Sequence, residues 1–190
     1  LVIDIDKSSL HQRIKTFCDM HYSDTDIRSM FFGNRQEGKY PAGDTRGWSL
    51  STARKTIADY DHHANIKKID YRPFDTRYIY YHSSMVDWGR EKVMQHFMLG
   101  ENIGLMTCRQ TVIDWSHIGV STHIVDDSRV SNKTKERGYV FPLYIYHNEY
   151  GSMTRQPNLD MEIVCQIAEK IGLQFEEEKS GNIEAFCPMD

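Results

Sequence analysis

The sequence predicts an α+β domain built from mixed short strands and packed helices. Apolar residues recur at helical spacing near both ends, whereas the middle of the chain carries short aromatic and β-branched runs typical of strands. Such a mixture of short helices and strands is typical of α+β proteins. A chain of 190 residues suits one domain, with room for an appendage, and can bury a core without disulfides.

Three helices and a loop are expected near the N-terminus. The first helix, with Ser8 or Ser9 as its N-cap, places apolar residues on one face at Leu10, Ile14, Phe17 and Cys18. A second helix begins at the Ser23 cap, and residues 33–47 form a loop rich in Gly, Asn, Arg and Pro. A third helix is predicted over residues 50–57.

The middle of the chain alternates between strand and helix patterns. Residues 66–81 predict a strand, a turn and a second strand, and residues 88–99 predict a helix. Further strands are expected over residues 103–107, 117–125 and 139–146.

A last amphipathic helix is expected to begin at the cap Asn158 and to end at Gly172. Its spacing predicts an inward face formed by Ile163, Ile167 and Ile171. Beyond Phe175 the chain is acidic, and we expect it to be frayed.

The net charge of −4 is unevenly distributed along the chain. Residues 176–190 carry five acids against Lys179, so residues 1–175 are neutral overall. Within this neutral body lies a basic loop, defined here as residues 128–138, which sets Glu136 among the four bases Arg129, Lys133, Lys135 and Arg137. Such a loop can contact DNA, and a merely solvated loop is the alternative.

Cysteine usage and hydropathy favour a cytoplasmic protein without a membrane segment. The cysteines form no C-x-x-C pair, so neither a disulfide framework nor a zinc ribbon is expected. The chain shows no signal peptide, and no apolar run is long enough to cross a membrane. Because it starts at Leu1 and not at Met, we expect it to be excised from a longer protein.

Some short motifs suggest catalysis, but the residues around them do not fit a catalytic site. Residues 33–39 have the G-x-x-x-x-G-K spacing, but Tyr40 and Pro41 stand where a phosphate-binding loop requires Ser or Thr and a helix. The chain has no Gly-x-Gly and no Pro-Pro pair, which excludes an S-adenosylmethionine glycine loop and an Asn/Asp-Pro-Pro-Tyr site. The histidine spacings match no zinc signature. We therefore expect no catalytic or metal-binding residues in this chain.

Residues 71–81 combine aromatic strands with a proline-fixed turn. Arg72 and Arg77 flank the turn, and guanidinium groups suit phosphates or guanine edges. In the alternative interpretation, both arginines form an internal ion-pair network with Asp75 that pins the turn, with Phe74 in the core. We favour this structural role for Asp75 and Phe74, and both roles stay open for the two arginines.

Two elements are weak separately but fairly specific together: Arg72-Pro73-Phe74-Asp75 and Phe141-Pro142-Leu143-Tyr144. With Arg109-Gln110 and Trp115-Ser116-His117, they resemble the C-terminal specificity domain of type ISP restriction–modification enzymes, long single-chain bacterial DNA adenine methyltransferases. The resemblance extends over nearly the full length of the chain. It implies a parent chain with nuclease, ATP-driven translocase, adenine-N6 methyltransferase and target-recognition domain, in that order. S-adenosylmethionine is then a cofactor of the parent, with ATP and Mg as further candidates.

We therefore expect a non-catalytic domain that recognises duplex DNA and positions it for the methyltransferase domain of the same chain. Residues 1–47 would be a helical lead-in from the methyltransferase region, residues 48–175 the recognition domain, and residues 176–190 an acidic truncated tail. The candidate DNA contacts are Arg72, Arg77, Arg109, Gln110, Arg129, Ser131, Asn132, Lys133, Lys135 and Arg137.

Two other functions remain open at this point. In the first, the domain is a structural or protein-interaction module that docks on a methyltransferase core without reading bases, and its mark is exposed apolar strands. In the second, the least favoured, it is an independent metal-dependent nuclease.

Overall fold

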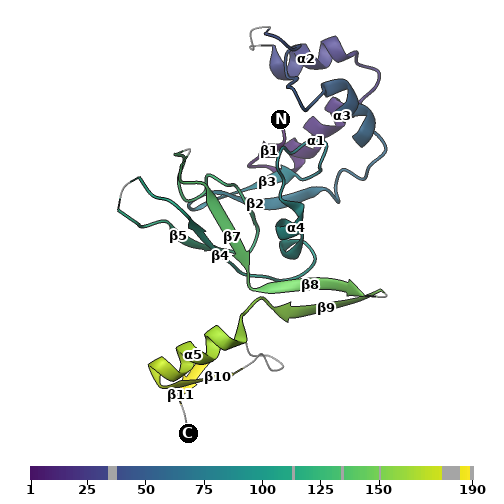
Figure 1. The fold of residues 1–190 in the computed structure, drawn as a ribbon. Coiled ribbons are helices and arrows are strands. Elements are labelled where there is room, and N and C mark those ends of the chain that lie inside the picture. The colour runs from purple at the N-terminus through teal and green to yellow at the C-terminus, as the bar shows by residue number, and fades with distance from the viewer. Residues whose placement is uncertain (34–37, 113, 134, 150, 177–184, 189–190) are drawn as a thin grey trace. The chain divides into compact units, whose positions relative to one another are not determined.

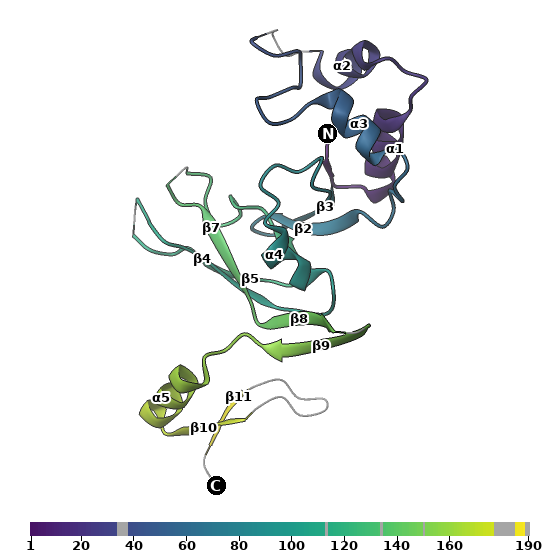
Figure 2. The same cartoon turned by 45° about the vertical axis from the view of Figure 1, so that its right-hand side comes forward.

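The computed structural model describes residues 1–190 except 34–37, 113, 134, 150, 177–184 and 189–190. The chain divides into two compact units, Leu1–Pro142 and Leu143–Asp190, which are described separately. Each unit mixes helices with short strands (Figures 1 and 2), so the predicted α+β class is confirmed.

The first unit opens with the helices α1 (Lys7–Cys18), α2 (Asp24–Phe32) and α3 (Leu50–Ile57). The side chain of Asp6 accepts a hydrogen bond from the Ser9 amide at 2.7 Å. The N-cap of α1 is therefore Asp6, not the predicted Ser8 or Ser9. The predicted Ser23 cap of α2 is confirmed, in a reciprocal capping box with Asp26.

The three helices share one apolar core with the strands that follow. Its buried members are Leu10, Ile14, Phe17, Cys18, Ile27, Leu50, Ala53, Ile57, Ile66, Tyr80 and Met85. Burial of one such Leu or Ile side chain contributes roughly 1.5–3 kcal/mol. Because residues on both sides of position 47 pack into this core, residues 1–47 do not form a separate structural part. The boundary between compact units lies after Pro142. The functional boundaries expected at residues 47 and 175 stay predictions.

A buried guanidinium group ties α3 to the connection between α1 and α2. Arg54 is only 2% exposed. Its Nε donates to the carbonyl oxygen of Phe17 at 2.8 Å, and its Nη2 donates to those of Asp19 at 2.7 Å and Tyr22 at 2.8 Å. Its Nη1 pairs with Asp24. A charged group can stay out of water here because its donors are satisfied.

The first sheet has the strand order β1 (Ile3–Asp4), β3 (Asp75–Tyr80), β2 (Ile66–Arg72) and β6 (Ile124–Val125). β3 is antiparallel to both β1 and β2, whereas β6 is parallel to β2. The predicted strand, turn and strand over residues 66–81 are thus confirmed. A second apolar core lies against this sheet and includes Ile69, Ile79, Met94, Met106, Ile124 and Val125.

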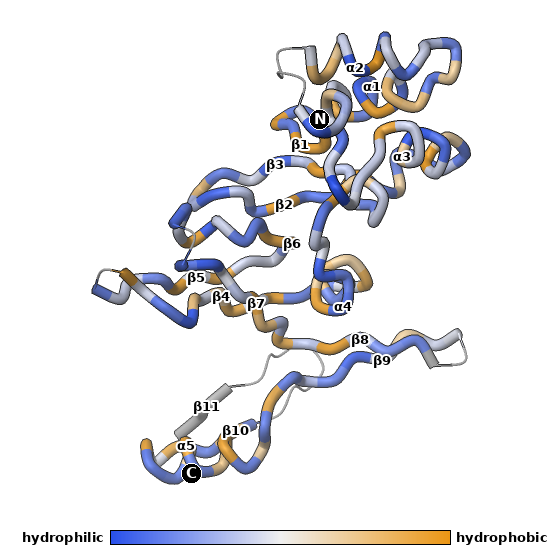
Figure 3. Tube along the Cα trace, turned by 45° about the horizontal axis from the view of Figure 1, so that its top comes forward, coloured by the Kyte–Doolittle hydropathy of each residue, from blue (hydrophilic) through white to orange (hydrophobic). Residues whose placement is uncertain are grey.

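The second sheet is antiparallel, in the order β5 (Ile118–Ser121), β4 (Gly104–Cys108) and β7 (Gly138–Pro142) (Figure 3). The single strand predicted over residues 117–125 is wrong. Ser121 Oγ accepts a hydrogen bond from the His123 amide at 3.1 Å and donates to Asp70 Oδ2 at 2.7 Å. These bonds hold a turn that carries the chain from β5 in one sheet to β6 in the other.

The helix predicted over residues 88–99 is shorter than expected. It consists of α4 (Glu91–Met94) followed by one 3₁₀ turn, η1 (Gln95–Phe97). Trp88 and Arg90 have left-handed φ angles of 55° and 56°. A residue in this conformation cannot continue a right-handed helix toward its N-terminus, and α4 therefore begins only after Arg90.

The second unit contains β8 (Tyr144–Glu149), β9 (Ser152–Pro157), α5 (Met161–Ile171), β10 (Leu173–Glu176) and β11 (Ala185–Pro188). β8 and β9 pair as an antiparallel hairpin, and so do β10 and β11. The single strand predicted over residues 139–146 is wrong, because β7 and β8 pair in different sheets. Part of the tail expected to be frayed is paired as β11, and residues 177–184 and 189–190 lie outside the described residues.

α5 is capped by Asp160, whose side chain accepts hydrogen bonds from two first-turn amides, and not by the predicted Asn158. It ends at Gly172 with φ of 65°, as predicted. The predicted inward face is wrong, because the buried side chains are Val164 and Ala168, and those exposed are Ile163, Ile167 and Ile171. None of the described helices combines the length and hydropathy that crossing a membrane requires.

Replacing Arg54 by alanine is expected to lower the free energy of unfolding by about 3 kcal/mol, because the carbonyl oxygens of Phe17, Asp19 and Tyr22 lose a buried donor. Urea denaturation followed by circular dichroism measures this change. The matched control is Lys55→Ala at the exposed neighbouring position, which should stay within about 0.5 kcal/mol of wild type. A loss below about 1 kcal/mol for Arg54→Ala would show that the carbonyl groups do not depend on the guanidinium.

Candidate nucleic-acid interface

The hairpin of β2 and β3 carries a β-bulge next to its turn. The strand register shifts between Asp70 and Arg72, which leaves Tyr71 without a partner on β3. A bulge re-aims a side chain. Here the Tyr71 ring lies against two guanidinium groups, with the Cζ of Arg72 at 4.0 Å and that of Arg77 at 4.3 Å from the ring centroid.

Both arginines are also paired with carboxylates. Arg77 holds Asp75 through Nε and Nη2 at 2.7–3.0 Å, and Arg72 Nη1 donates to Asp126 Oδ1 at 2.8 Å. The hydrogen bonds between Arg77 and Asp75 lower the pKa of the carboxyl group and raise that of the guanidinium. The expected ion pair between Arg77 and Asp75 is thus confirmed, whereas Arg72 pairs with Asp126 and not with Asp75. The expectation that Phe74 lies in the core is wrong, because its side chain is fully exposed.

The basic loop is joined to its surroundings by two further ion pairs. Arg129 Nε lies 3.6 Å from Oδ2 of Asp70 on β2. Arg137 Nη1 donates to Asp127 Oδ1 at 2.8 Å. Two of the four bases in the loop therefore neutralise acids of the same unit, which reduces the charge they can offer to a ligand.

The centre of the basic loop is the carboxylate of Glu136, which is 1% exposed. It accepts hydrogen bonds from the Ser131 hydroxyl at 2.5 Å, the Val112 amide at 2.6 Å and His117 Nε2 at 3.1 Å. These bonds, with that of Ser131 first, lower the pKa of Glu136 to about 2. His117 Nδ1 accepts from the Ser116 amide, which assigns the ring proton to Nε2. The loop is therefore folded around a buried anion and is not merely solvated.

The cations that project from the loop are Lys133 and Lys135. Both are exposed, and neither forms an ion pair with any residue that the structure describes. Arg109 is exposed as well, with its Cζ 4.6 Å from the centroid of the Tyr139 ring. Two further predicted base contacts are exposed, Gln110 and Asn132.

The structure gathers the predicted DNA contacts at one connected edge of the first unit. The hydrogen bond from Val112 to Glu136 joins the loop after β4 to the basic loop. The ion pair between Arg72 and Asp126 joins the β2–β3 turn to the start of the same loop. Ser131 also lies at this edge, but Glu136 accepts the hydrogen bond of its hydroxyl group.

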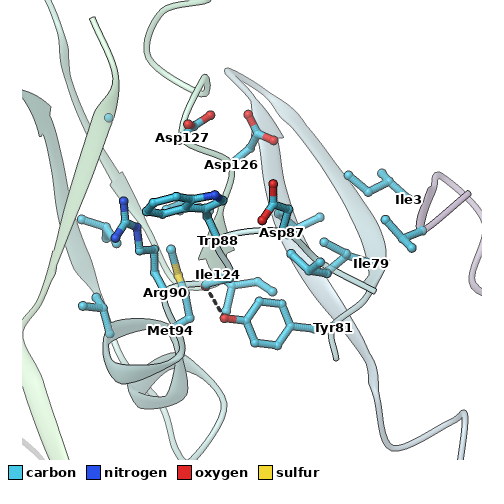
Figure 4. Close-up of a pocket in the computed structure, with 18 of the residues that line it drawn as sticks. Ile3, Ile79, Tyr81, Asp87, Trp88, Arg90, Met94, Ile124, Asp126 and Asp127 are labelled. Carbon is cyan, nitrogen blue, oxygen red and sulfur yellow. Dashed lines mark hydrogen bonds between the residues drawn. The ribbon is translucent and has the colours of Figure 1, made fainter. Parts of the chain in front are cut away.

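A cavity of about 700 Å³ lies within the same unit (Figure 4). Its apolar lining includes Ile79, Met94 and Ile124. Exposed Trp88 stands at its rim, with Arg90 Cζ 5.0 Å from the ring centroid. Sequence reasoning missed both residues, and the glycine between them is the signal that could have marked an irregular backbone. Three carboxylates at the rim disfavour a phosphate group here: Asp87, Asp126 and Asp127.

The hydrogen bonds by which Glu136 holds the basic loop are expected to weaken in acid. The folded-state pKa of Glu136 is about 2, below its ordinary value of 4.5. The ionised carboxylate therefore stabilises the folded loop fully above pH 4.5, and this stabilisation is lost as the pH falls toward 2. The amide resonance of Val112, followed by NMR from neutral to acidic pH, measures this change. Glu136→Gln is the control, which should lack the acid transition and show a shifted Val112 amide already at neutral pH. A wild-type resonance that does not move in this range would contradict the assignment.

Comparisons with known proteins give structural likenesses and one family. No curated protein matches the chain. The fold is similar to that of the "ATP-dependent Type ISP restriction-modification enzyme LlaBIII bound to DNA", with TM-score 0.57 and 13% identity over 87% of this chain and 11% of that one. It is also similar to the "DrdV-DNA complex", with TM-score 0.54 and 16% identity over 90% of this chain and 16% of that one. The chain thus spans a small part of either enzyme.

The family whose model matches residues 1–185 is described as the Type ISP C-terminal specificity domain. This match extends over nearly the whole chain and agrees with the resemblance expected from Arg72-Pro73-Phe74-Asp75 and the other elements. The chain therefore belongs to the Type ISP C-terminal specificity domain family.

Proposed function

We propose that this domain recognises the DNA target of a bacterial restriction–modification enzyme and positions duplex DNA for adenine-N6 methylation by the methyltransferase domain of the same chain. The observation that carries the proposal is the pair of exposed cations, Lys133 and Lys135, on a loop that buried Glu136 holds in place. Membership of the specificity-domain family supports it, as do the two similar structures described above, both of which are complexes with DNA.

In this proposal the phosphate contacts come from Lys133, Lys135 and the half-exposed side chain of Arg137. Arg129 supports the loop from within, since its side chain is 16% exposed beside Asp70. Arg72 and Arg77 stabilise the turn through their pairs with Asp126 and Asp75. Only the guanidinium N–H groups that these carboxylates do not bind would be left to contact DNA.

Base contacts are assigned to exposed side chains with fork-like or bidentate polar groups. Arg109 suits guanine, and its guanidinium group lies over the Tyr139 ring. Gln110 and Asn132 suit adenine. Ser131 moves from the predicted base contacts to a supporting role, because its hydroxyl is bound by Glu136.

The proposal leaves the chemistry to other domains of the parent chain. S-adenosylmethionine would bind the methyltransferase domain, and ATP and Mg would serve a translocase or a nuclease. Among the described residues, no three His, Cys, Asp or Glu side chains are grouped so that they could hold a metal ion. Residues 1–47 would follow the methyltransferase region, residues 176–190 would form an acidic tail, and the enzyme would act in the cytoplasm, where bacterial DNA lies.

Replacing Lys133 and Lys135 together by alanine is expected to weaken DNA binding to a similar extent for all sequences. Each lost phosphate contact lowers the slope of log K against log salt by roughly 0.9, so the double variant should lose about 1.8. Fluorescence anisotropy with labelled duplexes between about 50 and 200 mM salt measures the slope. The matched control is the double variant Lys15→Ala with Lys55→Ala on α1 and α3, which should have the same salt slope as wild type. An unchanged slope in the Lys133 and Lys135 variant would remove the basic loop from the interface.

A second candidate function is supported by the exposed face of the second sheet. Its apolar side chains are 40–58% exposed: Leu105, Ile118, Val120, Tyr139 and Phe141. Val120 on β5 and Phe141 on β7 both face Leu105 on β4, so the three side chains form a continuous row. Contiguous exposed apolar surface is typical of protein interfaces. This face favours a structural module that docks on a methyltransferase core without reading bases.

If this face is an interface, the 190-residue chain should associate with itself when purified alone, and Leu105→Ser with Val120→Ser should reduce that association. The thermal midpoint should change little, because both side chains are already exposed. Sedimentation velocity over a range of protein concentrations measures the change, with exposed Met30→Ser on α2 as the control. A wild-type chain that stays monomeric at all concentrations argues against the docking function.

A further inference from the structure

Phe74 combines a disfavoured backbone conformation with full exposure. It is the second residue of the two-residue turn between β2 and β3, and its φ is 61°. Pro73 before it has φ fixed near −65°. A negative φ followed by a positive φ is typical of a type II turn, whose second central position favours glycine. The relative accessibility of the Phe74 side chain is 106%, so no apolar burial offsets the unfavourable contact of its Cβ.

The residues around the turn enforce this conformation. The Tyr71 ring lies against the guanidinium groups of Arg72 and Arg77. Arg77 grips both oxygens of Asp75 directly after the turn, and Arg72 directly before it is paired with Asp126. Strained residues persist where their surroundings over-determine them, and such positions cluster at functional sites. The phenyl ring is therefore presented outward from a rigid turn and not from a loose loop.

The turn that carries Phe74 lies close to the stem of the basic loop, because Arg72, directly before the turn, pairs with Asp126 at 2.8 Å. The Asp126 amide donates to the Asp70 carbonyl oxygen at 3.1 Å, and the Gly138 amide donates to the Asp127 carbonyl oxygen at 2.7 Å. The stem of the loop that carries Lys133 is thus bound to β2, close to the turn. An apolar ring next to phosphate-binding cations is the arrangement that DNA-bending proteins use to insert a side chain between bases.

We propose that Phe74 inserts into the base stack of the bound DNA as an apolar wedge, which opens one base step while Lys133 and Lys135 hold the neighbouring phosphates. The inference rests on the DNA recognition proposed above and adds a specificity-determining residue to it. A wedge makes no hydrogen bond to a base, so it selects sequence through the cost of unstacking. Flexible pyrimidine–purine steps such as TA and CA have the lowest cost, and the wedge should favour them.

The test uses duplexes that carry the fluorescent adenine analogue 2-aminopurine at TA, at CA and at stiff A-tract steps, titrated with the 190-residue chain. With wild type, the fluorescence should rise at a flexible step, because the analogue brightens when it is unstacked. With Phe74→Gly, this rise should disappear and the affinity should fall roughly tenfold. The salt slope should stay the same, because the phosphate contacts remain.

Three controls separate the wedge from a structural role. Glycine and asparagine adopt a left-handed φ readily, so Phe74→Gly and Phe74→Asn should both fold and keep the thermal midpoint while losing the fluorescence rise. Phe74→Tyr keeps the ring and should restore the rise. Tyr60→Ala, at a half-exposed aromatic residue elsewhere in the first unit, should leave DNA binding unchanged.

Wild-type affinity and fluorescence in folded Phe74→Gly would overturn the wedge and leave DNA recognition standing, with the ring then free for a protein partner. If the folded wild-type chain binds none of the duplexes even at low salt, the wedge and the proposed DNA recognition both fail.

Discussion

The buried carboxylate of Glu136 is the constraint on which the edge of the first unit depends. An anion that is removed from water is stable only where donors replace its hydration. Here the donors come from Ser131 in the basic loop itself, from His117 and from the Val112 amide. The donors can converge only when the loop after β4 and the loop after β6 fold together. The positions of Lys133 and Lys135 follow from that convergence.

The pairing of acids and bases explains how a neutral body can present a positive edge. The arginines that flank the turn and the loop are largely engaged with Asp70, Asp75, Asp126 and Asp127. Paired in this way, the arginines have mainly a structural role, since guanidinium groups hold carboxylates in a fixed geometry. Lys133 and Lys135, which pair with no carboxylate that the structure describes, then supply charge at a defined place. Net charge alone therefore says little about whether such a domain can hold nucleic acid.

The same unit turns apolar groups outward at several places. Phe74 and Trp88 both have left-handed φ angles and exposed rings, and the second sheet leaves one face uncovered. A protein that worked alone would gain stability by covering these groups, since each exposed ring forgoes its hydrophobic contribution. The arrangement fits the proposed function, in which DNA and a neighbouring protein domain would cover these groups.

The sequence by itself determined the features that depend on local signals. The Ser23 cap, the helix over residues 50–57 and the Gly172 stop were all predictable, because caps and periodicity act within one or two turns. The strand, turn and strand over residues 66–81 followed from Pro73 and the aromatic runs around it. Asp75 and Arg77, two residues apart on one strand, share a face of the sheet, so their pairing could also be anticipated.

Only the tertiary structure decided the features that join distant parts of the chain. The strand predicted over residues 117–125 is interrupted because Ser121 forms a hydrogen bond with Asp70, 51 residues earlier. Arg72 pairs with Asp126 because β6 lies parallel to β2 in the same sheet. The outward direction of Phe74 and the anchoring role of Glu136 also depend on the surrounding contacts. Short-range patterns say which residues can form an element. They do not say which long-range partner satisfies its charges and hydrogen bonds, because that depends on how the sheets are ordered in space.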